Sequence, residues 1–362
     1  MKTLGLLLAS LLVALLLAEL GVRAFWDVAA PAVGRPAAPP TEAEGRAAAE
    51  LAGTELPELH SLHELGQPGA RGVHKGLPFR NNRSGFRGPE YSTVPAADVF
   101  RIALAGDSIT MGTGVLEEDA YAARLEAHLN QLASGVRYEV LNLGLSGLNA
   151  TQVAARVRKL GSQYAPHLLV YGYTMNDIQG PAYVSTFSGA GPARFYRYRR
   201  FLDSPSYLLR AVWPRLLALW EMSTHPVGTL EHDLHSNYFD NEAAWAGVER
   251  AFDDLAAHGG DQGVCLHLLV HTGIAQLNRL YPFLPVMEKV EAAARARGFS
   301  VTQSFPYFEG RDPTQLRLSA MDPHPNAAGH EILASALLDG LRDLPEHCWS
   351  AGPGGRPVAL AP

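Results

Sequence analysis

Two short polar blocks, far apart in the chain, carry residue types that could attack a carbonyl carbon. The first is Gly106-Asp107-Ser108, and the second holds Asp322 and His324 with one residue between them. A serine hydroxyl is a weak nucleophile until a base within hydrogen-bond reach takes its proton, and a carboxylate fixes the tautomer of that base. We therefore expect Ser108 to be a nucleophile, His324 its base and Asp322 the group that orients the base.

Two further blocks lie between these in the sequence, and each follows a predicted strand. They are Asn142-Leu143-Gly144-Leu145-Ser146-Gly147 and Thr174-Met175-Asn176-Asp177. Taken in order, the four blocks resemble those of the SGNH (GDSL-type) hydrolase family, which supply Ser, Gly, Asn and His. The resemblance covers roughly residues 78–342.

This resemblance implies a fold, an activity and a set of roles. The fold is α/β, a three-layer α/β/α sandwich with a mostly parallel, five-stranded, flavodoxin-like sheet. The activity is hydrolysis of acyl esters without a cofactor or a metal. The oxyanion would be stabilised by the N–H groups of Ser108 and Gly147 and by the side-chain amide of Asn176. Gly147 is preferred to Gly144 because the family's glycine falls five residues after the asparagine that ends the strand, here Asn142.

The chain departs from the family pattern at two positions. The commonest spacing is Asp-x-x-His, but Met321 stands three residues before His324 and Asp322 stands two before it. We keep Asp322 as the orienting acid, with Asp312 or a Ser–His dyad with backbone support as alternatives. The third block usually begins with glycine, where this chain has Thr174.

The elements that must position these residues alternate between strand and helix. Apolar runs and amphipathic periods predict strands near 100–106, 138–143, 167–173, 264–270 and 299–303, and helices near 118–133, 149–163, 241–257, 284–297 and 326–340. This alternation predicts a parallel sheet with helices on both faces, whose ligands bind at the carboxyl ends of the strands. Asp107 and Asp177 follow strands, and we expect them to hold their loops through side-chain-to-backbone hydrogen bonds.

Composition limits the classes of protein that fit. The chain has 362 residues, of which 47% are hydrophobic and 18% charged, so a sizeable core is expected. The net charge of −6 argues against a nucleic-acid-binding protein. No cluster with metal-ligand spacing is visible. Cys265 and Cys348 could form one disulfide in an oxidising compartment, but two unpaired thiols, with Cys265 in a strand, are the interpretation that we favour.

The N-terminal segment predicts export. Residues 3–18 are uncharged and mostly Leu and Ala, and as a helix they span about 24 Å, slightly less than a hydrocarbon core of about 30 Å. Because Trp26 suits a membrane interface, we expect residues 3–26 to contact the membrane as an uncleaved anchor. The catalytic domain would then lie in the cell envelope, outside the cytoplasm, and would be periplasmic or secreted if the segment is cleaved.

The expected organisation has four parts. A membrane anchor or signal segment at residues 1–27 precedes a Pro/Ala-rich tether at 28–77, the hydrolase domain at 78–345 and a disordered tail at 346–362. The domain carries a helical insertion at 181–240, whose apolar stretch at 207–222 is either core or a lid over a pocket. Asn81 to Gly88 is similar to a stretch ahead of the first block in envelope-associated members of the family. For Arg87 we favour a structural hairpin on the sheet edge over a place at the site mouth.

Three functions fit these residues. The leading hypothesis is a serine esterase acting on small acyl esters, with acetyl groups on a glycan as candidates and a lipase with a lid as a variant. The second is an O-acyltransferase for a cell-surface polysaccharide, because the same machinery can pass the acyl group to a sugar hydroxyl. The third is a non-catalytic glycan-binding domain on the same fold.

Overall fold

The computed structural model describes residues 2–24, 43, 47, 56–132, 135–184, 206, 208–209, 212, 230–319 and 322–349. The chain divides into two compact units. One comprises Met1–Pro36, Val184–Asp233 and Ser319–Met321, and the other Ala37–Tyr183, Leu234–Leu318 and Asp322–Pro362. The second unit holds the sheet and all four polar blocks.

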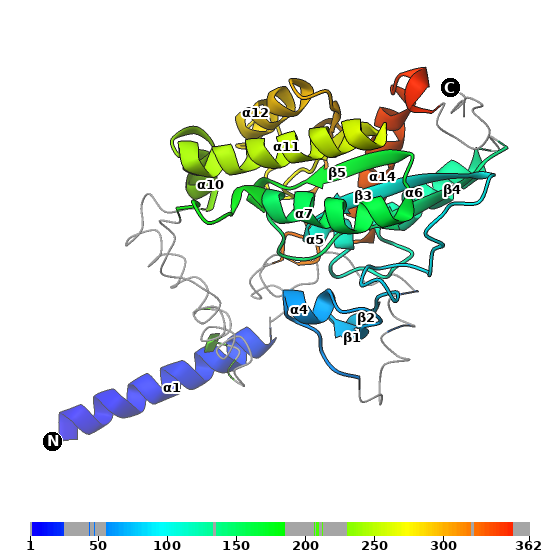
Figure 1. Cartoon of the computed structure of the whole chain (residues 1–362). Helices are drawn as coiled ribbons and strands as arrows, with labels where there is room; N and C mark the ends of the chain where they lie inside the picture. Colours follow the sequence, from blue (N-terminus) through cyan, green and yellow to red (C-terminus); the bar gives the residue numbers. More distant parts are fainter. Residues whose placement is uncertain are drawn as a thin grey trace. The chain divides into compact units, whose positions relative to one another are not determined.

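Five parallel strands form the central sheet, in the order β4-β3-β5-β6-β7. Figure 1 labels β4, β3 and β5 of this sheet. Their bounds are β3 Val99–Gly106, β4 Arg137–Asn142, β5 Leu168–Tyr173, β6 Cys265–Val270 and β7 Ser300–Gln303. The predicted strands are confirmed, and the order is the flavodoxin-like one. Every residue of β3 is buried, as expected for a central strand covered on both faces.

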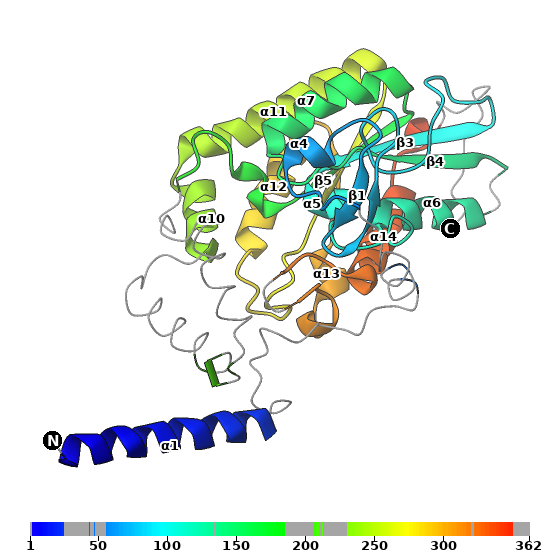
Figure 2. The same cartoon turned by 90° about the horizontal axis from the view of Figure 1, so that it is seen from below.

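Helices cover both faces of the sheet, which confirms the three-layer α/β/α fold. Alternate side chains of β3 enter two separate hydrophobic clusters. Ala103 and Ala105 pack with residues of α7 (Ala150–Leu160), α11 (Glu242–Gln262) and α12 (Leu284–Arg295). Ile102 and Leu104 pack with residues of α6 (Tyr121–Gln131) and α14 (Ala327–Arg342). Helices α7 and α11 lie side by side (Figure 2).

Short elements complete the second unit. Strands β1 (Arg71–His74) and β2 (Leu77–Arg80) form an antiparallel hairpin in a sheet of their own. Residues 56–77, which we assigned to a tether, thus include α4 (Leu62–Leu65), β1 and the start of β2. The other bounds are α5 Ser108–Met111, η2 Gly161–Tyr164, η3 Met175–Ile178, α13 Phe305–Phe308, η4 Pro313–Gln315 and η5 Glu346–Cys348.

A disulfide joins Cys265 and Cys348, so our expectation of two unpaired thiols is wrong. Cys265 begins β6, and Cys348 lies 83 residues later in η5, with their Cα atoms 5.5 Å apart. Cys348 and Trp349 are both buried, and the Trp349 ring packs 5.0 Å from that of Phe100. The start of the segment that we expected to be a disordered tail therefore packs on the sheet. Residues 350–362 lie outside the described part.

Helix α1 (Lys2–Ala24) includes most of the segment that we expected to anchor the chain. Its uninterrupted apolar run ends at Glu19, which pairs with Arg23 at 2.9 Å. Within the described residues, no helix has the length and apolar character needed to cross a membrane. The membrane contact expected for residues 3–26 stays a prediction, and residues 25 and 26 lie outside the described part.

Most of the expected helical insertion at 181–240 lies outside the described residues, including nearly all of the stretch at 207–222. Its last part is helix α10 (Leu230–Phe239). The choice between core and lid for this insertion therefore stays a prediction.

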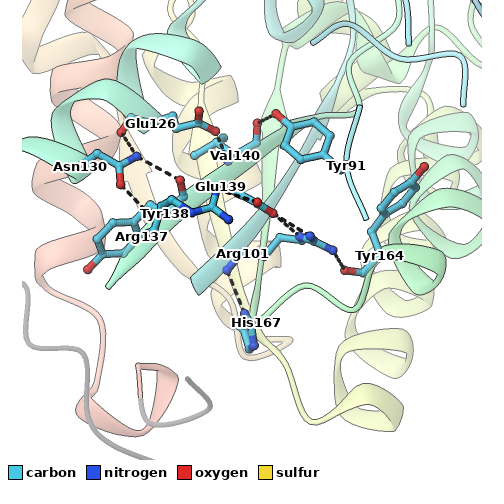
Figure 3. A network of polar contacts seen from close by, with 10 residues as sticks. All are labelled: Tyr91, Arg101, Glu126, Asn130, Arg137, Tyr138, Glu139, Val140, Tyr164 and His167. Atoms are coloured by element: carbon cyan, nitrogen blue, oxygen red, sulfur yellow. Dashed lines mark hydrogen bonds and ion pairs between the residues drawn. The ribbon is translucent and has the colours of Figure 1, made fainter. Parts of the chain in front are cut away.

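A buried ion pair joins the neighbouring strands β3 and β4 (Figure 3). Arg101 on β3, which is 1% exposed, donates to Glu139 on β4 through Nε at 2.9 Å and Nη2 at 2.6 Å. It also donates to the carbonyl of Tyr164 at 2.5 Å. Arg137, in contrast, is 53% exposed and pairs with the other oxygen of Glu139 at 2.9 Å. The same carboxylate thus has one buried and one exposed partner.

This pair of arginines gives a matched test of stability. We expect Arg101→Met to lower the free energy of unfolding by about 3 to 5 kcal/mol, because Glu139 is left without its buried partner. Arg137→Met should cost less than about 1 kcal/mol, since that pair is exposed. Urea unfolding of both variants measures the difference, and equal losses would contradict the assignment.

Candidate active site

Ser108 lies at the carboxyl end of β3, where the strand turns into helix α5. It is the first residue of that helix, a position whose N–H has no carbonyl partner within the helix. Asp107 caps the helix by accepting the N–H of Ile109 at 3.0 Å. The turn requires a glycine at 106, because a Cβ there would lie 2.1 Å from Oγ1 of Thr110 and 2.6 Å from the carbonyl oxygen of Gly172.

The structure brings Ser108, His324 and Asp322 into one hydrogen-bonded line. Nε2 of His324 lies 2.9 Å from Oγ of Ser108, and Nδ1 lies 2.5 Å from Oδ1 of Asp322. A carboxylate only accepts, so Nδ1 carries the proton and Nε2 is free to accept from the serine hydroxyl. Oδ1 of Asp322 also accepts the backbone N–H of His324 at 3.2 Å, so the contact forms despite the one-residue spacing.

The Asp322 carboxylate has a second partner, the cation of Lys75. Burial alone would raise its pKa, but the hydrogen bonds and charges of His324 and Lys75 hold that pKa well below its ordinary value. The Lys75 ammonium lies 2.7 Å from Oδ2, so the two carboxylate oxygens have different partners. Asp312, the alternative acid, accepts both its hydrogen bonds from Thr314 instead. Asp322 thus remains ionised wherever the imidazole is neutral.

The two expected glycine positions differ in their surroundings. Gly147 has a φ of +82°, the left-handed region that favours glycine, and it lies open to solvent. Gly144 packs instead on the nucleophile turn, where a Cβ would lie 2.3 Å from the backbone nitrogen of Met111. Gly144 is therefore required for close packing, whereas the N–H of Gly147 lies on an accessible loop.

Asn176 lies close to Ser108 through a shared neighbour. The side-chain amide of Asn176 donates to Oδ2 of Asp107 at 3.4 Å, and the same oxygen lies 3.3 Å from Oγ of Ser108. Asp107 is fully buried, and burial raises its pKa against the opposing effect of its hydrogen bonds. As expected, both Asp107 and Asp177 hold their loops, since Asp177 accepts the N–H of Thr174 at 3.2 Å.

A buried chain of hydrogen bonds continues behind Asp107. The hydroxyl of Thr174 donates to Oδ1 of Asp107 at 2.9 Å and lies 3.0 Å from Nδ1 of His271. Nε2 of His271 lies 3.2 Å from the hydroxyl of Tyr121, which pairs with Thr110 at 2.8 Å. Burial lowers the pKa of His271 to about 3, so it is neutral and can donate at one nitrogen and accept at the other.

Arg87 supports the other end of helix α5. Its guanidinium is buried and donates to the carbonyl oxygens of Gly112 at 2.6 Å, Val115 at 2.7 Å and Met111 at 3.2 Å. Burial lowers its pKa to about 10, so it remains charged at neutral pH. Its backbone also bridges Asn142 at the end of β4, which confirms a structural role at the sheet edge.

Residues 104–332 match the model of the GDSL-like lipase/acylhydrolase family. This match covers more than half of the chain. The chain belongs to this family. It is accordingly a hydrolase of carboxylic esters.

Two solved structures are similar to this chain at low identity. An α/β-hydrolase enzyme, LAE5, from the metagenome of Lake Arreo is 22% identical, with 67% of this chain and 94% of that one covered and a TM-score of 0.41. The acetylxylan esterase Axe2 from Geobacillus stearothermophilus is 18% identical, with the same coverage and a TM-score of 0.42. A search of curated proteins finds no match.

One group among the described residues could approach a metal ion, namely Cys265, His347 and Cys348. Both cysteine sulfurs belong to the disulfide, so neither is a thiolate that could bind a metal.

Sequence reasoning missed Lys75, which contacts Asp322, and His271, which reaches Asp107 only through Thr174. His271 directly follows the strand predicted at 264–270, and its place at the carboxyl end of that strand was the available signal. Lys75 lies on a hairpin inside the stretch assigned to a tether, and no pattern pointed to it. Thr174 was noticed only as a replacement of glycine.

The hydroxyl of Thr174 provides a test of this buried chain. We expect Thr174→Val to lower the free energy of unfolding by about 1 to 3 kcal/mol, because Asp107 and His271 lose a buried partner. Thr174→Ser keeps the hydroxyl and should cost about 0.8 kcal/mol or less, the value of one methyl group. Denaturant unfolding compares the two, and similar losses would show that the hydroxyl is unimportant.

Proposed function

We propose that this chain is a serine esterase in which Ser108 is the nucleophile, His324 the general base and Asp322 the group that orients it. The observation that carries the proposal is the continuous line from Oγ of Ser108 through His324 to Asp322, with distances of 2.9 and 2.5 Å. The first distance, from Oγ of Ser108 to Nε2 of His324, lies within the range in which a base can take the serine proton.

The reaction would proceed in two halves. Oγ of Ser108 attacks the carbonyl carbon as Nε2 of His324 takes its proton, and the charged Asp322 stabilises the imidazolium. The imidazolium then protonates the leaving alcohol, which departs and leaves an acyl-serine. Water, deprotonated by His324, attacks that ester, and the proton returns to Ser108 as the acid leaves.

Three donors are proposed to stabilise the oxyanion, namely the N–H groups of Ser108 and Gly147 and the amide of Asn176. The first N–H of α5, the positive φ of Gly147 and the hydrogen bond from Asn176 to Asp107 support this assignment. Asp107 holds Asn176 and caps the nucleophile helix, so one buried carboxylate would fix two of the three donors.

For the substrate we propose small acyl esters, with acetyl groups on a glycan as the first candidates, met outside the cytoplasm in the cell envelope. The disulfide between Cys265 and Cys348 supports this compartment, because disulfides persist where the surroundings are oxidising.

Hydrolysis of 4-nitrophenyl acetate by the full chain tests the proposal. Ser108→Ala should lower kcat by about 10⁴-fold or more, because no other group replaces the nucleophile. The matched control is Ser162→Ala, which removes the hydroxyl of an exposed serine and should leave kcat unchanged.

Equal rates for wild type and Ser108→Ala would remove Ser108 from the mechanism. A panel of esters from acetate to palmitate, with an acetylated polysaccharide as a further substrate, locates the preferred acyl group. Acetyl groups recovered on an added sugar, in place of free acetate, would contradict hydrolysis as the reaction.

A further inference from the structure

The tip of the β1–β2 hairpin holds a lysine in an unusual backbone conformation. His74 pairs with Leu77, so the loop has two residues, Lys75 and Gly76, with φ of +53° and +79°. Positive φ at both positions is the type I′ geometry, which prefers Asn-Gly or Gly-Gly. The Cβ of a lysine disfavours this backbone region. We therefore attribute the presence of a lysine at this position to a contact of its side chain.

The side chain of Lys75 reaches the predicted catalytic acid. Its ammonium lies 2.7 Å from Oδ2 of Asp322, while His324 uses Oδ1. The two partners come from a hairpin and a loop 247 residues apart in the sequence. With both oxygens bonded, the carboxylate cannot rotate away from the imidazole without losing one contact.

The hairpin is itself fastened to the nucleophile side of the site. Arg80 on β2 donates to both oxygens of Glu117, through Nε at 3.0 Å and Nη2 at 3.1 Å. Glu117 lies two residues after Val115, whose carbonyl accepts a hydrogen bond from Arg87. Phe79 is buried in the main hydrophobic cluster, and Nδ1 of His74 pairs with the carbonyl of Leu59 at 2.9 Å. The ammonium is thus presented by a fixed turn.

We propose that Lys75 is a positioning residue of the active site. It holds Asp322 in place beside His324 and offsets part of the negative charge of that carboxylate. This inference rests on the proposed function, because it assigns a role at the same site. Lys75 does not touch the reacting atoms and acts through Asp322 alone.

The charges around His324 set the direction of the effect. Asp322 on its own loop, Asp107 at the cap of α5 and His330 on α14 interact electrostatically with His324, and Lys75 on the hairpin pairs with Asp322. His330 is fully buried, and burial lowers its pKa well below the ordinary value, so it is neutral. The Lys75 ammonium offsets the negative charge of Asp322, the carboxylate that stabilises the imidazolium, and so opposes formation of the imidazolium. Without the Lys75 ammonium, His324 should therefore stay protonated, and the enzyme inactive, up to a higher pH.

The variant that separates charge from fold is Lys75→Asn. It removes the ammonium but supplies the Asn-Gly pair that the turn prefers, so the thermal midpoint should be unchanged or higher. With 4-nitrophenyl acetate and the full chain, we expect kcat to fall about tenfold. The acid limb of the kcat/KM profile should move to higher pH. Arg71→Met, which removes an exposed cation from the other end of the hairpin, should change neither.

Two results would overturn the inference while leaving the esterase proposal intact. One is a Lys75→Asn enzyme with the kcat and acid limb of the wild type. The other is a variant with a lower kcat, a lower thermal midpoint and an unchanged acid limb of the pH profile, which would indicate that the lysine has a purely structural role. Absence of Ser108-dependent hydrolysis in the wild type would instead be the failure of the proposed function, and the inference would fall with it.

Discussion

A single hydrogen bond, from Ser108 to His324, joins two side chains 216 residues apart in the sequence, and the fold is what closes that separation. Ser108 lies just after the buried strand β3, and His324 lies just before α14, a helix that packs on the sheet to which β3 belongs. Because all five strands are parallel, their carboxyl ends meet at one edge, and loops that are distant in sequence converge there. The chemistry of the site therefore depends on the order of the strands as much as on the residues themselves.

Burial gives that edge its rigidity. A carboxylate without partners would be costly inside the domain, yet Asp107 is fully buried because it accepts from Ile109, Thr174 and Asn176. Each of these bonds also fixes an element of the site: the nucleophile helix, the third block and the candidate oxyanion donor. His271 extends the network through its contact with Thr174, the residue that stands where the third block usually begins with glycine. The side chain of Thr174 thus supplies a hydrogen bond to Asp107 that a glycine could not make.

Much of this arrangement was predictable from the sequence, and the exceptions have physical reasons. Long apolar runs predicted all five strands of the sheet, and the spacing after Asn142 led to Gly147, whose positive φ agrees with that choice of glycine. The contact of Asp322 with His324 could be expected in spite of its short spacing. The disulfide was missed because two cysteines 83 residues apart carry no pairing signal. Lys75 was missed because a lysine in a turn ordinarily faces solvent, and only the fold shows what lies opposite.

The most direct measurement of the central claim is the site of covalent labelling by a phosphonofluoridate, which reacts with a serine activated by a neighbouring base. After labelling and tryptic digestion, the added mass should lie on Ser108, within the peptide of residues 102–124. The same label should be nearly absent from His324→Ala, because the hydroxyl then has no base to take its proton. Labelling of a different serine, or undiminished labelling of Ser108 without His324, would contradict the account.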